Sequence, residues 1–297
     1  MVRVEKRVAG GESYYYLGHS FRFKGKVRKK ELYLGKAVPR DIEAVKKKFM
    51  QEIYAEKWFG VFDKIKSGYG RDQAKAPDYV KEKELEAFAI KFTYDTNRIE
   101  GSKLSFRDTA NLLQRGITPK EKPVRDIKEA ESHNKVFREM LEYCKNFSLQ
   151  IILYWHRRLL ENTKAELAGK IRDHQVAISG SRFMPPSPVE VAPLLKEFFR
   201  WYERSKTGMN AIQLAALVHL KLVTIHPFGD GNGRISRLAM NFVLHKRKYP
   251  MLDIRYEKRT GYYNALERAQ VKNDEGIFLN WFFKAYAKEN KRHLKGG

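Results

Sequence analysis

The stretch LVTIHPFGDGNGRISRL, residues 222–238, places a histidine, an aspartate, three glycines and two arginines between two apolar segments. Pro227 cannot continue the apolar helix that precedes it, so the chain is expected to turn at His226. The glycine-rich segment then leads into RISRLAMNFVL, which has the pattern of a second buried helix. We therefore expect a polar loop between two buried helices, ending at a helix N-terminus.

This loop has the features of a phosphate-binding site. Free backbone N–H groups at a helix N-terminus attract anions. Gly231 and Gly233 flank Asn232 and would let a phosphate approach the backbone closely. Arg234 and Arg237 are three positions apart, so they share one helix face and can reach the same polyphosphate.

Asp230 and His226 add a metal ligand and a base to the loop. One carboxylate together with phosphate oxygens is the usual way in which proteins hold Mg²⁺. An imidazole at the edge of such a site can take a proton from a hydroxyl nucleophile. The loop lacks the Gly-Lys-Ser/Thr ending of a Walker A loop. The combination indicates phosphoryl chemistry in which a base, a metal carboxylate and an anion-binding loop act together.

Composition narrows the class of protein. The chain has 297 residues, a hydrophobic content of 42% and a formal net charge of +24, which favours polyanionic partners. A solvated lysine-rich surface explains that charge equally well. Cys144 is the only cysteine, which excludes an internal disulfide and a multi-cysteine metal site. No signal peptide is apparent, and the longest apolar run (211–225) contains polar residues, so we expect a cytoplasmic protein with no membrane partner.

Residues 1–75 are interpreted as a basic N-terminal accessory module, with 19 Lys or Arg against 9 Asp or Glu. Within it, FRFKGKVRKKELYL (21–34) has a turn signal between aromatic and β-branched stretches, which predicts a β-hairpin. A helix is expected from residue 41, and Gly68 and Gly70 predict its end. Such a module could bind nucleic acid or another polyanion, or present an ordinary solvated surface.

The remainder of the chain has an almost wholly helical pattern, which we divide into a helical region (76–145) and a second part (146–297). The segment 171–188 interrupts the helices, because Val176 and Ile178 alternate with polar neighbours before a glycine and a proline-rich run. It predicts a short β-hairpin flap on a mainly α domain. Helices are predicted at about 78–101, 106–115, 125–145, 149–162, 189–204, 211–225, 233–247, 257–271 and 277–290.

HPFGDGNGRISR (226–237) matches the complete Fic family pattern H-x-F-x-[DE]-G-N-G-R-x-x-R. The flanking AALVHLKLVTI and RLAMNFVL, and GKIRDHQVAISG with PPSP upstream, also resemble this family. The resemblance covers roughly residues 80–290 and leaves residues 1–75 outside. It implies a Fic-type helical bundle with residues 146–297 as the catalytic core. It also implies a nucleotidyltransferase, usually one that moves AMP from ATP to a Ser, Thr or Tyr hydroxyl of a target protein (AMPylation).

The resemblance also implies roles for individual residues. His226 would be the general base, and Asp230 would hold Mg²⁺ between the phosphates. The loop Gly231, Asn232 and Gly233 would cradle the α- and β-phosphates, while Arg234 and Arg237 would hold the outer ones. Tyr262 and Tyr263 fall where the family places adenine-facing groups. The flap would register the target segment by strand addition through Gln175, Val176, Ala177, Ile178 and Ser179.

DTNRIEG (95–101) matches the family's inhibitory pattern [ST]-x-x-x-E-[GN], with Thr96, Glu100 and Gly101 at the defined positions. It lies before the core, as in the subgroup whose inhibitory helix is N-terminal. The resemblance implies that Glu100 forms a salt bridge with Arg237 and takes the cation that should orient the γ-phosphate. We therefore expect an autoinhibited enzyme.

Other interpretations stay open at this point. The same site could remove AMP from a modified protein, with Glu100 orienting water, or transfer UMP or phosphocholine. The chain could instead be a nucleic-acid-binding protein in which residues 1–75 are the main functional part. The sequence also leaves a homodimer open. His219 is expected to be a core histidine, and Lys170 and Arg172 are expected at a solvated edge before the flap.

Overall fold

The computed structural model describes residues 2–23 and 25–294, and the chain divides into two compact units, Met1–Lys64 and Ile65–Gly297. The predicted boundaries at residues 75 and 145 stay predictions. Within the described residues, no helix combines the length and the apolar character that crossing a membrane requires.

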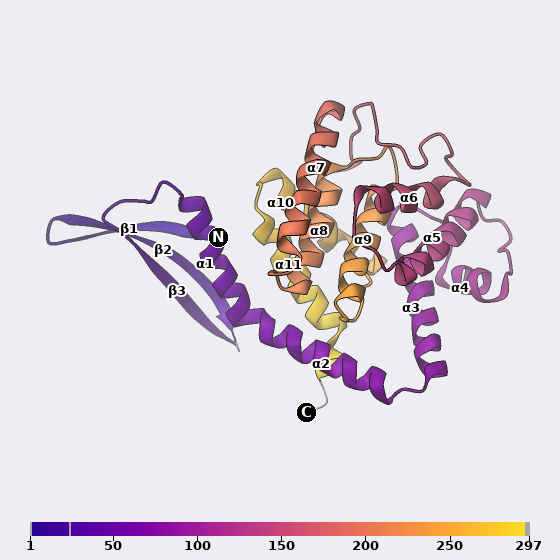
Figure 1. Cartoon of the computed structure of the whole chain (residues 1–297), viewed down its shortest axis with the longest axis horizontal. Helices are drawn as coiled ribbons and strands as arrows, with labels where there is room; N and C mark the ends of the chain where they lie inside the picture. Colours follow the sequence, from indigo (N-terminus) through magenta and orange to yellow (C-terminus); the bar gives the residue numbers. More distant parts are fainter. Residues whose placement is uncertain (1, 24, 295–297) are drawn as a thin grey trace. The chain divides into compact units, whose positions relative to one another are not determined.

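The N-terminal unit contains an antiparallel three-stranded sheet in the order β1-β2-β3 (Figure 1). Its strands are β1 (Arg3–Ala9), β2 (Glu12–Phe23) and β3 (Lys26–Gly35). The pairing of Phe23 with Lys26 confirms the predicted hairpin. β1 was not predicted, because RVEKRVA has only two apolar residues other than its terminal alanine. Leu17 and Phe21 of β2 pack against Phe49 and Ile53 of α1 (Ile42–Tyr54).

The helix predicted to end at Gly68 and Gly70 continues further. A π-helical turn (Ala55–Phe59) links α1 to α2 (Gly60–Lys75), which includes both glycines. A side chain at Gly68 would overlap the carbonyl oxygen of His293. Gly68 therefore permits a close approach between two segments and does not end a helix, which corrects the prediction.

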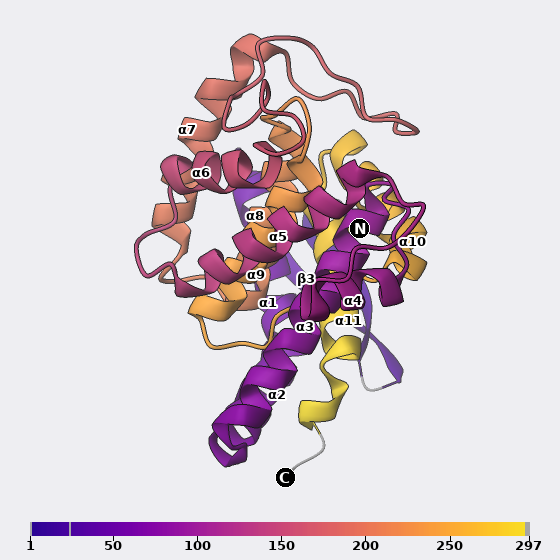
Figure 2. The same ribbon diagram turned by 90° about the vertical axis from the view of Figure 1, so that its right-hand side faces the viewer.

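The C-terminal unit is helical, and its helices match the predicted ones closely (Figures 1 and 2). They are α3 (Asp78–Ile99), α4 (Phe106–Arg115), α5 (Val124–Glu142), α6 (Leu149–Leu160), α7 (Pro188–Ser205), α8 (Ala211–Ile225), α9 (Asn232–Lys246), α10 (Arg259–Val271) and α11 (Glu275–Glu289).

Helices α8 and α9 form the centre of this unit. α8 packs against α7, α9 and α11, and α9 packs against α3, α5, α6 and α8. Every residue of α8 except Lys221 and Thr224 is buried, because the helix is apolar on nearly all sides. The loop between α8 and α9 is thus fixed at both ends by the most buried helices of the unit.

The predicted β-hairpin flap is wrong in its secondary structure. In the described chain the strands are β1, β2 and β3, and residues 171–187 form an irregular loop. Gln175 closes this loop by donating from Nε2 to the carbonyl oxygen of Pro185 at 3.1 Å. Alternation alone predicted a strand, but Pro185 and Pro186 lack the N–H groups that a paired strand needs.

Candidate active site

His226 lies at the joint between α8 and the loop, where its backbone has the left-handed conformation (φ 51°). Its Nδ1 lies 3.2 Å from the carbonyl oxygen of Val223. A carbonyl can only accept, so Nδ1 carries the proton and Nε2 keeps a lone pair. Burial lowers the pKa of His226 below its ordinary value, and the nearby Arg172 adds to this effect. The imidazole is therefore neutral at pH 7 and able to act as a base.

Asn232 holds the shape of the loop. Its side chain accepts from the backbone N–H of Phe228 at 2.9 Å and donates to the carbonyl oxygen of the same residue at 2.8 Å. Gly231 precedes it at φ 80°, a conformation that glycine adopts without strain, and caps the N-terminus of α9. The Asn232 amide thus fixes the loop internally, and the free N–H groups of the first turn of α9 follow it.

His156 of α6 packs against the loop between α8 and α9. Its ring stacks on that of Phe228 with centroids 3.7 Å apart and an interplanar angle of 7°. The N–H of Gly169 donates to its Nδ1 at 3.0 Å, so Nε2 must carry the proton that is donated to the carbonyl oxygen of Asp230 at 2.9 Å. Burial lowers the pKa of His156 to about 4, which keeps the ring neutral. One neutral histidine therefore connects α6, the segment before the flap and the loop.

Asp230 is surrounded by positive groups. Lys164 forms a short ion pair with its Oδ2, Arg234 lies 3.4 Å from the same oxygen, and the N–H of Gly231 donates to Oδ1 at 2.6 Å. Burial raises the pKa of this carboxyl, but Arg234, Lys164 and the Gly231 N–H outweigh burial and hold the pKa below its usual value. Asp230 is therefore an ionised carboxylate at neutral pH.

Asp230 suits an ion that takes most of its ligands from phosphates and water. No group of three His, Cys, Asp or Glu residues within residues 2–23 and 25–294 could hold a metal by itself. The carboxylate side chain is 26% exposed and so remains accessible from the loop. A single accessible carboxylate fits Mg²⁺ bound together with a nucleotide, not a metal held by protein ligands alone.

The Arg234 side chain is buried between the loop and α5. Its guanidinium is 1% exposed and forms an ion pair at 2.9 Å with Glu129 of α5, in addition to its contact with Asp230. Glu129 is held in turn by Arg125 at 2.8 Å. Arg234 therefore contacts the Asp230 carboxylate from the buried side of the loop. The predicted contact of Arg234 with an outer phosphate stays a prediction.

Arg237 is bound by the helix that precedes the core. Its Nη2 lies 2.5 Å from Oε1 of Glu100, and its Nε donates to the hydroxyl of Thr96 at 2.6 Å. Burial opposes the charge on Arg237, but Glu100 raises the pKa of the guanidinium above its usual value. The Glu100–Arg237 ion pair expected from the sequence is present.

Gly233 makes room for this ion pair. A Cβ at this position would overlap Oε1 of Glu100 and would lie 3.0 Å from Nη1 of Arg237. The glycine that would let a phosphate approach the first turn of α9 instead has the Glu100 carboxylate beside it. The carboxylate therefore lies where the predicted nucleotide site meets Arg237.

Tyr262 and Tyr263 differ in their surroundings. Tyr262 is buried, and its hydroxyl lies 2.8 Å from Nε2 of His219 and 3.4 Å from Nη1 of Arg237. Burial lowers the pKa of His219 to about 3, as expected for a core histidine. Tyr263 is 43% exposed and donates to the carbonyl oxygen of Ile99 at 3.1 Å. Tyr262 thus braces Arg237, and an adenine contact by either tyrosine stays a prediction.

The expectation for Arg172 is wrong. Its side chain is buried and donates to three carbonyl oxygens, those of His226 at 2.8 Å, His174 at 3.0 Å and Pro186 at 2.5 Å. The guanidinium therefore ties both ends of the flap to the catalytic loop. The flap residues Gln175, Val176, Ala177, Ile178 and Ser179 are half-buried or exposed beside it.

Four supporting residues were missed by sequence reasoning: Glu129, His156, Lys164 and Arg172. The chain separates them from the loop by 54 to 105 positions, since Arg172 is 54 positions from His226 and Glu129 is 105 positions from Arg234. Their types alone gave no signal, because a histidine on an apolar helix face and a glutamate in a charged helix are common. The packing of α5 and α6 against α9 brings Glu129 and His156 to the loop, and the segment after α6 brings Lys164 and Arg172.

Comparison with known families agrees with this geometry. Residues 146–244 match the model of the Fic/DOC family. This range holds the complete loop, His156, Lys164 and the flap. Residues 146–244 of the chain are therefore a Fic/DOC family domain.

Two curated relatives show how much of the chain is similar to proteins with a stated activity. The chain is 34% identical over 186 residues to "Protein adenylyltransferase fic-1" of Caenorhabditis elegans, covering 61% of this chain and 36% of that protein. It is 34% identical over 209 residues to "Protein adenylyltransferase Fic" of Culex quinquefasciatus, covering 67% of this chain and 39% of that protein. The chain thus spans little more than a third of the length of these curated relatives.

Solved structures share the fold over a larger part of the chain. A Fic domain containing signaling protein from Bacteroides thetaiotaomicron superposes with a TM-score of 0.72 at 25% identity, covering 79% of this chain and 97% of that one. The solved part of Fic-1 from C. elegans superposes with a TM-score of 0.71 at 26% identity, covering 86% of this chain and 76% of that one. The predicted Fic-type helical fold is confirmed.

Proposed function

We propose that this chain is a protein adenylyltransferase that transfers AMP from ATP to a Ser, Thr or Tyr hydroxyl of a target protein and of itself. The proposal is supported by the names of the curated relatives and by the complete loop between α8 and α9. The observation that carries it is the contact of Nδ1 of His226 with the carbonyl oxygen of Val223 at 3.2 Å. Nε2 of His226 therefore has a free lone pair at the edge of an anion-binding helix N-terminus.

The proposed reaction begins with proton transfer. Nε2 of His226 takes the proton of the target hydroxyl, and the hydroxyl oxygen forms a bond to the α-phosphorus of ATP. The bond from that phosphorus to the oxygen bridging to the β-phosphate breaks, and pyrophosphate leaves. Positioning and charge neutralisation provide most of the catalysis in such reactions.

The loop would position the nucleotide. Asn232 and Gly233 would present backbone N–H groups to the α- and β-phosphates at the N-terminus of α9, and Gly231 would join them once its N–H is released by Asp230. Asp230 would hold Mg²⁺, which neutralises phosphate charge when bound. Arg237 would reach the γ-phosphate once Glu100 releases it.

We propose that Glu100 inhibits the enzyme in this way. The carboxylate holds Arg237 and occupies the space beside Gly233. A nucleotide in the productive pose would place its γ-phosphate against that carboxylate, so that like charges repel. Autoinhibition thus follows from two effects of one side chain, the loss of a cation and the addition of an anion.

Residues 171–187 would bind the target beside His226. Their backbone is unpaired by any strand of the described chain, so an extended target segment could add to it. Arg172 holds the flap at a fixed position relative to His226, because its guanidinium donates to the carbonyl oxygens of both His226 and Pro186. A cytoplasmic location suits the lone cysteine and the use of ATP.

Removal of AMP is the second candidate reaction. The Glu100 carboxylate is 29% exposed, which leaves room for a water molecule that it could orient. Incubation of AMP-modified protein with the wild type and with Glu100→Gln separates the two reactions. Release of AMP by the wild type but not by the variant would favour removal.

The test of the proposed function compares the protein-bound label obtained from nucleotides labelled at different phosphates. The Glu100→Gly variant is incubated in separate reactions with ATP labelled at the α-phosphate, ATP labelled at the γ-phosphate and UTP labelled at the α-phosphate. We expect protein-bound label from α-labelled ATP alone. Label from γ-labelled ATP would show phosphate transfer, and label only from α-labelled UTP would show another nucleotide specificity, so either result would overturn the proposal.

A further inference from the structure

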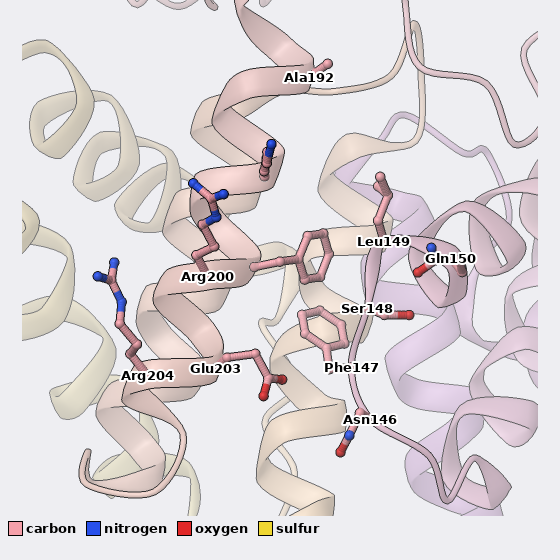
Figure 3. Close-up of a pocket in the computed structure, with 11 residues that line it drawn as sticks. Asn146, Phe147, Ser148, Leu149, Gln150, Ala192, Arg200, Glu203 and Arg204 are labelled. Atoms are coloured by element: carbon pink, nitrogen blue, oxygen red, sulfur yellow. The ribbon is translucent and has the colours of Figure 1, made fainter.

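A groove of about 870 Å³ lies between α7 and the segment that leads into α6 (Figure 3). Its floor is apolar and includes Phe147, Leu149, Ala192 and Phe199. Phe147 and Phe199 are in ring contact, with centroids 5.7 Å apart. Phe147 is buried, whereas Leu149 and Phe199 are half-buried, so the floor rests on the packed core at Phe147.

The two rims of the groove differ in charge. The α7 rim carries Lys196, Arg200 and Arg204, each four positions from the next and therefore on one face of the helix. The opposite rim is polar and uncharged, with Asn146, Ser148 and Gln150. In Figure 3, Arg200 and Arg204 extend from the side of α7 turned away from the segment that carries Phe147 and Leu149, and both line the groove.

These three cations are available to a partner. All three are exposed, and none forms an ion pair with another residue in the part of the chain that the structure describes. The acidic residue of the groove, Glu203, is already paired with Lys206 at 2.6 Å. The rim therefore presents uncompensated positive charge beside an apolar floor.

From these features we propose that the groove docks an acidic amphipathic helix of the target protein. Such a helix would place an apolar stripe on the floor and Asp or Glu residues along the α7 rim. From Lys196 to Arg204 the charged rim extends for roughly 12 Å at 1.5 Å per residue, which is about two turns of a docked helix. Charge and length thus favour one kind of occupant.

The position of the groove connects it to the catalytic site. α7 begins at Pro188, directly after the flap, and Ala192 follows one turn later. A target whose hydroxyl lies at the flap could therefore extend along α7 and place a second segment in the groove. This step rests on the proposed function, whereas binding of an acidic helix to the groove can be tested without it.

The binding test uses a fluorescein-labelled helical peptide of about five turns with leucines on one stripe and glutamates on one flank. Its anisotropy is measured with the full chain and with the variant Lys196→Gln/Arg200→Gln/Arg204→Gln. We expect about tenfold weaker binding to the variant, because each exposed ion pair contributes modestly and three are lost. A peptide with glutamines in place of the glutamates should bind the wild type as weakly.

The matched control removes three exposed cations from α5, as Lys128→Gln/Lys135→Gln/Arg138→Gln. This variant has the same net charge as the groove variant and should bind the peptide like the wild type. An equal loss in both variants would show unspecific attraction to a basic protein. Either that result or unchanged binding to the groove variant would overturn the proposal.

Leu149→Glu tests the apolar floor. Leu149 is the first residue of α6, where a glutamate is favourable for the helix. We expect this variant to remain folded and to bind the acidic peptide at least as weakly as the groove variant. Sedimentation of the wild type provides a further outcome: a dimer that dissociates in both groove variants would show that a second copy covers the groove, which would contradict the proposal.

Self-labelling distinguishes a failure of the docking proposal from a failure of the proposed transferase function. In the Glu100→Gly background, the groove variant should label itself as strongly as its parent, while labelling of a protein fused to the acidic peptide should fall. If no variant transfers label, the proposed function fails and the peptide anisotropy still decides whether the groove binds an acidic helix. Equal labelling of the fused protein by parent and groove variant would contradict docking for catalysis.

Discussion

Nη2 of Arg237 lies 2.5 Å from Oε1 of Glu100, although the two residues are 137 positions apart in the sequence. The guanidinium is almost fully buried and the carboxylate is partly exposed. This ion pair joins the last residue of the loop motif to the end of helix α3. In the function that we propose, activity would depend on whether Arg237 is bound by Glu100 or by a nucleotide.

Replacing Glu100 should activate the enzyme. Glu100→Gly and Glu100→Gln both remove the charge on the carboxylate, and we expect each to raise self-labelling from α-labelled ATP about tenfold or more, since a charge-assisted contact contributes about 1.5–3 kcal/mol. Glu100→Gln separates charge from shape. Labelling rates equal to that of the wild type in both variants would contradict autoinhibition by this residue.

Lys164 should compete with Mg²⁺ for Asp230. The Lys164→Met variant leaves the carboxylate without its ammonium partner, so we expect Mg²⁺-dependent ATP binding to tighten by roughly two- to fivefold. Calorimetric titration of ATP at several Mg²⁺ concentrations measures this change. Lys170→Met, which removes the same charge from an exposed neighbour in the same segment, is the control. Weaker Mg²⁺ dependence in Lys164→Met than in the control would contradict the competition.

His156 should be a positioning residue. His156→Phe keeps a ring on Phe228 but removes the hydrogen bonds to Asp230 and Gly169. We expect the free energy of unfolding to fall by about 1–3 kcal/mol, because two partly buried backbone groups lose their partners. Chemical denaturation measures this loss. A labelling rate that falls while ATP affinity stays unchanged would show that the base, not the nucleotide, has shifted.

Stability should fall with acid because of the same histidine. The folded pKa of His156 is about 4, below the ordinary value of 6.5, so the unfolded chain takes up the proton first. Its contribution is therefore complete above pH 6.5 and is lost progressively as pH falls to 4, by about 3 kcal/mol in total. His156→Gln should flatten the pH dependence of unfolding in this window. An unchanged slope would contradict the neutral state assigned to the ring.

Local pattern predicted the parts of this molecule that depend on neighbours in the sequence. The approximate boundaries of α3 to α11 and the turn at His226 follow from apolar periodicity and from Pro227, which act over a few residues. The Glu100–Arg237 pair was expected only because a family pattern related two distant segments. No periodicity in the sequence connects α3 with α9.

The predictions for the flap and for Arg172 were wrong because both depend on contacts with other segments of the chain. The flap was predicted as strands from the alternation at Val176 and Ile178, but a strand needs a partner that alternation cannot show. Arg172 was placed at a solvated edge because an isolated arginine is usually exposed. Its burial depends on three carbonyl oxygens brought together by the loop and the flap.

The central claim is that His226 acts as the base of an AMP transfer that Glu100 restrains. Transfer from α-labelled ATP should be measured for Glu100→Gly alone and for Glu100→Gly with His226→Ala, at matched ATP occupancy. We expect strong labelling by the single variant and loss of labelling by the double variant, with ATP still bound. Equal labelling by both variants would contradict the role of His226 as the base.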